Sequence, residues 1–141
     1  MNTSNVQNEI LSILDEDKIG TLATVVDNKP QSRFMSFYHE HFTLYTPTDL
    51  NTHKVESIKQ NPAVHILIGY TGEGLHDSYL EIEGQAELIT DSTEKQKWWQ
   101  DKWTHWFEGP NDPHYVLLKI TPSVFRIMNI GEETPKTLEL S

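Results

Sequence analysis

The sequence predicts a mainly β protein, in which an antiparallel sheet closes into a barrel and helices lie outside it. Seven short segments are rich in β-branched and aromatic residues, and most are joined by short turns. One of them, "YLEIEGQAELIT" at residues 79–90, alternates apolar and polar residues, as a strand with one wet face does. Hairpin-linked strands favour antiparallel pairing, and six or seven of them are enough to form a small barrel.

The strands are predicted from β-prone runs that end at turn residues. They cover residues 19–26, 31–38, 42–46, 63–69, 79–90, 115–122 and 124–129. Asp27 to Pro30 form the first turn, and residues 47–52 form a loop. Gly84 in the middle of a strand predicts a bulge or sharp bend, such as small barrels use at corners.

Three helices are predicted from capping and stop signals. Ser4 and Gln7 form a capping box for a helix over residues 5–16, and apolar residues follow at helical spacing. A short helix over residues 53–60 ends before Pro62. A longer helix over residues 91–107 ends before Gly109 and Pro110.

Length and composition limit the class of protein. The 141 residues suit one domain over residues 1–130, followed by a polar tail over residues 131–141 that is expected to be loose. A net charge of −10 argues against a nucleic-acid surface and against binding to anionic lipid. There is no cysteine, no signal-peptide pattern and no apolar run of membrane-spanning length, so we expect a cytoplasmic protein without a membrane partner.

Two cations stand out in this acidic chain. Arg33 lies on a predicted strand, where it could simply cover apolar neighbours. Lys54 opens a predicted helix, although the positive end of the helix dipole disfavours lysine. An anion, phosphate above all, would explain a cation at that end, with Thr46, Thr52 and His53 as further donors. The alternative for Lys54 is a solvated loop.

Four tryptophans fall within nine residues, and Trp99, Trp103 and Trp106 follow helical spacing. Packing of an aromatic stripe on the barrel explains most of them. The excess could instead line a planar ligand or a subunit interface. His39 and His41 form an H-x-H pair, but no third ligand is evident, so no metal site is predicted. No nucleophile–base arrangement is evident either, so the catalytic groups stay unknown.

The run from "IGTLATVV" to "NPAVHILIG" resembles the pyridoxamine 5′-phosphate oxidase-like split β-barrel family, and within it the general stress protein 26 group. The "SRFM" strand, the T-x-x-K turn and the "NPAV" helix stop carry the resemblance. It covers roughly residues 5–129. The fold that it implies is a six- to seven-stranded antiparallel split β-barrel with peripheral helices.

The resemblance also implies a homodimer that binds FMN between its subunits, while FAD or a deazaflavin could take its place. Arg33 and Lys54 would contact the flavin phosphate, and the strand after the arginine would run beside the ring. The implied cofactor-binding residues are Arg33, Phe34, Met35, Ser36, Thr46, Thr52, His53, Lys54, Trp103 and Trp106. The C-terminal part holds one arginine, Arg126, in place of the arginine-rich segment of true pyridoxamine 5′-phosphate oxidases, which argues against that activity.

Three functions fit these expectations. The first is an FMN-dependent oxidoreductase linked to the general stress response, acting on a small molecule. The second is a flavin-binding sensor or carrier without turnover. The third is a small barrel that binds no flavin and acts through protein contacts.

Overall fold

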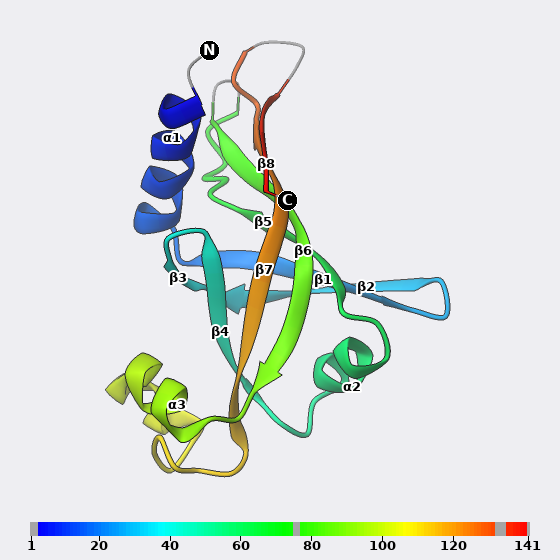
Figure 1. The fold of residues 1–141 in the computed structure, drawn as a ribbon, viewed down its shortest axis with the longest axis vertical. Coiled ribbons are helices and arrows are strands. Elements are labelled where there is room, and N and C mark those ends of the chain that lie inside the picture. Colours follow the sequence, from blue (N-terminus) through cyan, green and yellow to red (C-terminus); the bar gives the residue numbers. More distant parts are fainter. Residues whose placement is uncertain (1–2, 75–76, 132–134, 141) are drawn as a thin grey trace.

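Eight strands form one antiparallel sheet in the computed structural model, which describes residues 3–74, 77–131 and 135–140. Along the chain the elements are α1 (Thr3–Glu16), β1 (Ile19–Val26), β2 (Lys29–Ser36), β3 (Tyr38–Glu40), β4 (Thr43–Asp49), α2 (His53–Gln60), β5 (Ala63–Ile68), β6 (Tyr79–Ile89), α3 (Ser92–Trp98), the 3₁₀ helix η1 (Asp101–His105), β7 (Tyr115–Met128) and β8 (Lys136–Glu139). The strands are ordered β2-β1-β5-β6-β7-β4-β3, and β8 pairs with β7. The sheet curls into a split barrel with α1 at one end and α2 and α3 at the other (Figure 1).

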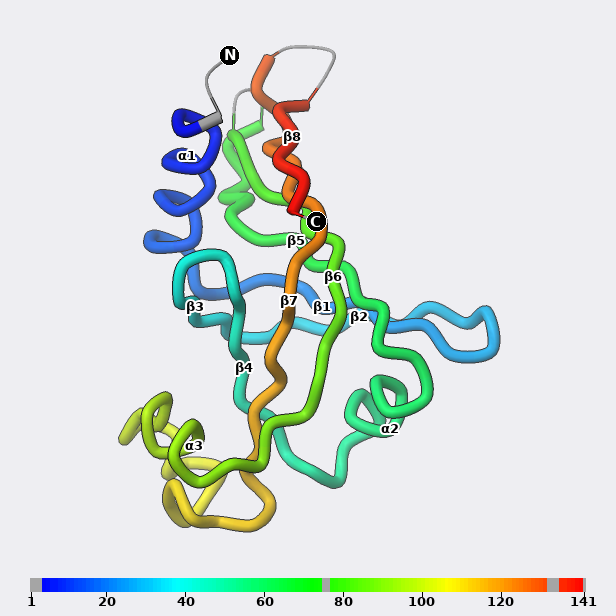
Figure 2. Tube along the Cα trace, in the orientation of Figure 1, coloured from blue at the N-terminus to red at the C-terminus, as the bar shows by residue number. Residues whose placement is uncertain are grey.

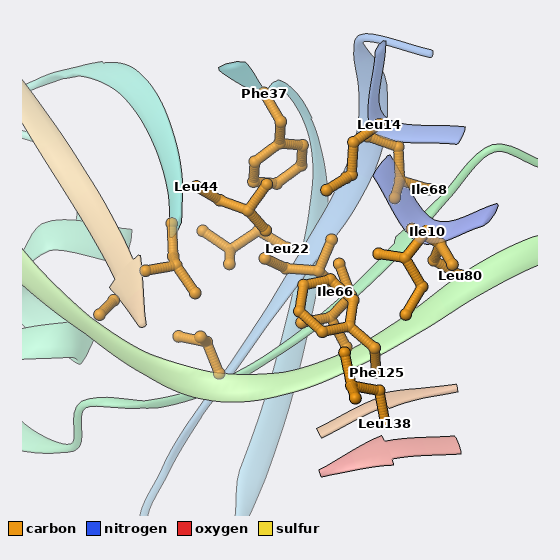
Figure 3. Packing of buried hydrophobic residues seen from close by; sticks show 14 of the residues in the cluster. Ile10, Leu14, Leu22, Phe37, Leu44, Ile66, Ile68, Leu80, Phe125 and Leu138 are labelled. Carbon is orange, nitrogen blue, oxygen red and sulfur yellow. The ribbon is translucent and has the colours of Figure 1, made fainter. Parts of the chain in front are cut away.

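Aliphatic side chains from almost every element fill the barrel. Ile10 and Leu14 of α1 meet Leu22, Ile66 and other strand residues in one buried cluster (Figure 3). Trp103, Phe107, Tyr115 and Leu117 form a second cluster at the α3 end. The first cluster therefore runs through the barrel from α1 to α2, and the second lies beside it under η1.

The predicted bend at Gly84 is confirmed. The β6–β7 register shifts between Glu83 and Gly84, which marks a bulge. A Cβ at Gly84 would lie 2.7 Å from the Thr121 carbonyl oxygen, so only glycine lets β7 approach this closely.

The two predicted strands at residues 115–122 and 124–129 are a single strand, β7, so that prediction is wrong. Pro122 lies opposite Gly84 in the bulged register. A proline has no N–H to donate to the ladder, but a bulge is a position where that loss is tolerated. The bend therefore curves the strand without ending it.

The predicted helix over residues 91–107 is also wrong, because the chain leaves helical geometry at Trp99, which has ψ 135°. The Trp99 and Trp103 rings then pack against the Tyr115 ring, with centroids 5.3 and 5.7 Å away. One straight helix could not place both rings against β7. The chain therefore forms two shorter helices here, α3 and η1.

The C-terminal tail is not loose where the structure describes it. Lys136–Glu139 pair with β7 as β8, and Leu138 is buried in the main cluster. Lys136 Nζ lies 3.2 Å from a Glu9 carboxylate oxygen of α1. The barrel domain therefore extends past residue 130 and includes this strand.

Candidate functional site

A cavity of about 410 Å³ lies where β2, β4, the start of α2 and η1 meet. We call it the β2–η1 cavity. It is lined by Phe34, Met35, Ser36, Pro47, Thr48, Asp49, Thr52, Lys54, Trp103, Trp106 and Phe107. Seven of the ten residues that the sequence suggested for a cofactor site are among these. Arg33, Thr46 and His53 are the three that do not line it.

Arg33 lies beside this cavity and is held by its own sheet. Its Nη1 donates to the Leu22 carbonyl oxygen at 3.1 Å and to Thr24 Oγ1 at 2.9 Å, and its Nη2 donates to Gln31 Oε1 at 3.3 Å. A guanidinium has five N–H groups, so donors are left over for an anion. Burial lowers the pKa of Arg33.

Lys54 is a partly buried cation that forms no ion pair or hydrogen bond with any residue in the described part of the chain. Burial lowers the pKa of its ammonium, and the positive charge of Arg33 lowers it further, while Asp49 acts in the opposite direction. Two cations thus lie close enough to repel each other at the edge of a cavity. An anion between them would offset that repulsion and compensate for the contacts with water that burial removes.

The first turn of α2 adds N–H groups to this edge. Thr52 is the N-cap residue, but its hydroxyl donates to the Asp49 carbonyl oxygen at 2.9 Å and makes no side-chain cap bond. The first-turn N–H groups of a helix have no intrahelical partner, and they carry the positive end of the helix dipole. They suit an anion such as phosphate.

On β4, Thr48 rather than Thr46 lines the β2–η1 cavity. Thr48 is 5% exposed and Thr46 is fully buried, and among the described residues neither hydroxyl has a hydrogen-bond partner. Residues two apart share a strand face, so a hydroxyl on this face was predictable. The strand runs on to Asp49 instead of ending at residue 46, so Thr48 is the residue at the cavity. An orphaned buried hydroxyl is costly unless a ligand pairs with it.

Three of the tryptophans pack against other rings of the fold, and the fourth, Trp106, is largely exposed and contacts only His105 among the described rings. Trp98 stacks on Tyr45 at 4.4 Å, and Trp99 packs on Tyr115. Trp103 belongs to the cavity lining but is only 2% exposed, because its ring packs on Tyr38, Trp99 and Tyr115. Trp106 is 72% exposed and lines the cavity, which makes it the ring free to meet a planar ligand.

Phe34 joins the β2–η1 cavity to a second, apolar concavity on the outer face of the sheet. This concavity has a volume of about 660 Å³. It is lined by Ile19, Gly20, Thr21, Phe34, Leu67, Ile68, Gly69, Tyr70, Tyr79 and Asn129. Phe34 is 78% exposed, and Ile19 and Tyr70 are also more than half exposed. Exposed apolar residues gathered in one concavity make this face a candidate interaction surface.

In the structure, the H-x-H pair is divided between strand β3, which holds His39, and the turn that follows, which holds His41. His39 Nδ1 faces the His41 carbonyl oxygen at 2.8 Å, and its Nε2 lies 2.6 Å from Asp15. His41 is in a turn with φ 53°, which turns it out of the strand. Within the described part of the chain, no group of three or more histidine and carboxylate residues could hold a metal ion. In the same part, no helix is long and apolar enough to span a membrane.

The fold and the cavity define a class, namely a split β-barrel with a partly buried cation pair at the edge of a cleft. The pyridoxamine 5′-phosphate oxidase family matches residues 6–129. General stress protein 26 of Bacillus subtilis (strain 168) is 47% identical over 140 residues, which is 99% of this chain and 100% of that protein. The chain therefore belongs to the pyridoxamine 5′-phosphate oxidase family.

Solved structures agree with this assignment. General stress protein 26 from Bacillus anthracis str. Sterne is 38% identical, with a TM-score of 0.84 over 96% of this chain and 99% of that one. A protein from Clostridium acetobutylicum described as related to general stress protein 26 has a TM-score of 0.82 over 99% of this chain and 97% of that one. It is 19% identical, so it supports the fold alone.

Proposed function

We propose that the β2–η1 cavity binds FMN and that the protein is an FMN-dependent oxidoreductase. The observation that carries this proposal is Lys54, which lies at the start of α2. Its side chain is partly buried, it has no ion-pair or hydrogen-bond partner among the described residues, and the charge of Arg33 acts on it. A flavin phosphate of about −1.5 to −2 charge would satisfy both cations and the first-turn N–H groups with charge-assisted hydrogen bonds. The remainder of the chain is acidic, so the attraction has to come from this local group.

The apolar walls of the cavity suit the ring system. Phe34, Met35 and Trp106 offer flat or flexible apolar surface, and Thr48 offers a hydroxyl without a partner among the described residues. Bound FMN supplies the redox chemistry, while these residues bind the ring, orient it and exclude water from it. Lys54 would hold the phosphate end, and Phe34, Met35 and Trp106 would hold the ring.

A second copy of the chain would complete the site. The outer concavity shares Phe34 with the cavity, and its exposed apolar residues need a cover. We propose a homodimer in which this surface is buried and the flavin lies at the subunit interface. The name of the Bacillus relative supports a role in the general stress response.

The second candidate is a flavin-binding sensor or carrier without turnover. It is favoured by the cavity lining, in which Lys54 and Asp49 are the ionisable side chains, and neither belongs to a nucleophile–base pair. The two candidates share the flavin site and differ only in electron transfer.

One experiment tests the proposal in two stages. Purified protein is mixed with excess FMN and desalted, and retained flavin absorbance is the expected result. The loaded protein is then mixed anaerobically with NADH or NADPH. Bleaching of the flavin supports the oxidoreductase, whereas retained flavin without bleaching by either donor supports the carrier. A colourless desalted protein would refute flavin binding altogether.

A further inference from the structure

Lys54 has the surroundings of a reactive amine. It lines the β2–η1 cavity, and it forms no ion pair or hydrogen bond with any residue in the described part of the chain. Trp106 lines the same cavity and is largely exposed, so small molecules can reach the amine from solvent. Figure 2 shows α2, which carries Lys54 at its start, at the periphery of the fold near the projecting β1–β2 hairpin.

Two features of the site favour the neutral form of this amine. Burial lowers the pKa of the Lys54 ammonium, and the charge of Arg33 lowers it further, although Asp49 acts in the opposite direction. The neutral form has the lone pair that attacks a carbonyl carbon. Desolvation and a neighbouring cation are means by which proteins activate a lysine for Schiff-base formation, and both act on Lys54.

Most other lysines of the chain lack these features. A carboxylate oxygen lies 2.8 to 3.9 Å from the ammonium of Lys59, Lys97, Lys119 and Lys136. Lys95 is 7% exposed, and its ammonium donates to a backbone carbonyl oxygen at 3.1 Å. A negative partner stabilises the charged form of an amine, and burial of the kind seen at Lys95 keeps reagents away from it. Lys54 combines access from the cavity with the absence of such a partner among the described residues.

The same edge of the cavity can hold a phosphate. Arg33 keeps N–H donors that its bonds within the sheet do not use, and the first-turn N–H groups of α2 lack an intrahelical partner. Thr48, which is 5% exposed and has no partner among the described residues, places a hydroxyl in the cavity wall. A nucleophile thus lies next to a phosphate site, with a hydroxyl in the same cavity that suits the oxygen of an attacked carbonyl group.

We propose that Lys54 of the flavin-free protein forms an imine with short-chain aldehydes that carry a phosphate group. The amine adds to the carbonyl carbon, the carbonyl oxygen takes up a proton, and the resulting carbinolamine loses one molecule of water. The reaction is a condensation, so it needs no oxidant or reductant. Arg33 and the α2 N–H groups hold the phosphate, and the aldehyde is short because the amine and the guanidinium lie at the same edge of the cavity.

This inference uses the cation pair of the proposed function but does not require that a flavin binds there. The phosphate of the aldehyde takes the place proposed for the flavin phosphate. Imine formation and flavin loading therefore exclude each other, so the concentration of phosphorylated aldehydes regulates how much of the protein carries a cofactor.

The test is reductive trapping of flavin-free protein with glyceraldehyde 3-phosphate. Cyanoborohydride reduces the imine to a stable secondary amine, and mass spectrometry of the peptides locates it. Lys54 is expected to be labelled at least about tenfold faster than Lys59, since hydrogen bonds from charged groups to the phosphate contribute at least that factor. Glyceraldehyde, which has no phosphate, should lose this preference. Excess FMN or inorganic phosphate should protect Lys54 and leave Lys59 unchanged.

A pair of arginine variants tests how the phosphate is held. Arg33→Gln removes the guanidinium and should slow labelling of Lys54 by glyceraldehyde 3-phosphate by at least about tenfold. Arg126 is the only other arginine of the chain, and it pairs with Glu81 at 3.0 Å outside the cavity. Arg126→Gln is therefore the matched control and should leave the labelling of Lys54 unchanged. The comparison of the two aldehydes uses wild-type protein, so it remains decisive even where Arg33→Gln does not fold.

The outcomes separate this inference from the flavin site. Labelling of Lys54 that is no faster than that of Lys59, or that is the same with and without the phosphate, overturns the imine proposal. Protein that retains FMN after desalting but shows no such labelling leaves the proposed function standing without the inference. Fast labelling of Lys54 that FMN does not suppress supports the imine and refutes flavin phosphate binding at this cation pair.

Discussion

Lys54→Met is the substitution that tests the phosphate site most directly. Methionine keeps most of the side-chain length and removes the charge. A hydrogen bond to a charged group contributes about 1.5–3 kcal/mol, so FMN affinity should fall about 10- to 150-fold. The measurement is a titration of flavin-free protein followed by quenching of flavin fluorescence. Riboflavin, which has no phosphate, should bind the variant and the wild type equally.

The same variant should behave in the opposite way when stability is measured. Lys54 is desolvated, and Arg33 repels it, which is why its pKa is lowered. Removing the charge relieves both costs, so flavin-free Lys54→Met should unfold at a urea concentration equal to or higher than the wild type does. The matched control is Lys59→Met on the same helix, where the lysine is exposed and outside the cavity. Equal FMN affinity of Lys54→Met and the wild type would show that the phosphate binds elsewhere.

The lowered pKa of Lys54 also sets a pH dependence. Between the folded pKa and the ordinary value of 10.5, the unfolded chain binds more protons at this group than the folded chain does. The contribution of Lys54 therefore raises the stability of flavin-free protein as pH rises through this window, and it lowers stability below it. The free energies of unfolding of the wild type and of Lys54→Met, measured by urea denaturation across that window, should converge as pH rises. A difference in free energy of unfolding that is the same at every pH would show that folding does not lower the pKa of Lys54.

Three further predictions concern other parts of the molecule. Thr48→Val removes a buried hydroxyl without a partner among the described residues, so flavin-free protein should lose no stability. FMN should bind the variant more weakly by about 0.5–1.5 kcal/mol in calorimetric titration. A loss of stability would show that the hydroxyl is bonded within the protein. Phe34→Ser removes a ring that is 78% exposed, so sedimentation should show monomers while the far-ultraviolet circular dichroism stays the same; an unchanged mass would place the interface elsewhere. Leu138→Ala in β8 should lower the free energy of unfolding by roughly 2–5 kcal/mol in urea, because the side chain is 7% exposed, and a loss near zero would mean that β8 is not needed.

The parts of the fold that the sequence predicted correctly are those fixed by local chemistry. The helix over residues 53–60 was predicted with the bounds that α2 has, because its start and its Asn61-Pro62 stop are both local signals. The Gly84 bulge was predictable for the same reason. The position of Lys54 at a helix start therefore follows from the residues around it.

The errors occurred where distant contacts decide. The break at Trp99 depends on Tyr115, which is far along the chain, and no local signal marks it. The polar segment Lys136–Glu139 forms a strand because its one apolar side chain, Leu138, reaches the core beside α1. Thr46 and Thr48 are equivalent by alternation, and only the length of β4 decides which one reaches the cavity. The role of every cavity residue in cofactor binding stays a prediction.

The pairing of Lys136 with Glu9 has a practical consequence. These residues are far apart in sequence but adjacent in the fold. The elements that carry them, α1 and β8, lie at the end of the barrel away from α2 and α3 (Figure 1). The chain has no cysteine, so cysteines introduced at positions 9 and 136 would be its only thiols. A pair of dyes attached there would be close together only when α1 and β8 are both docked. Their energy transfer would follow closure of this end of the barrel without touching the cavity where the cofactor is proposed to bind.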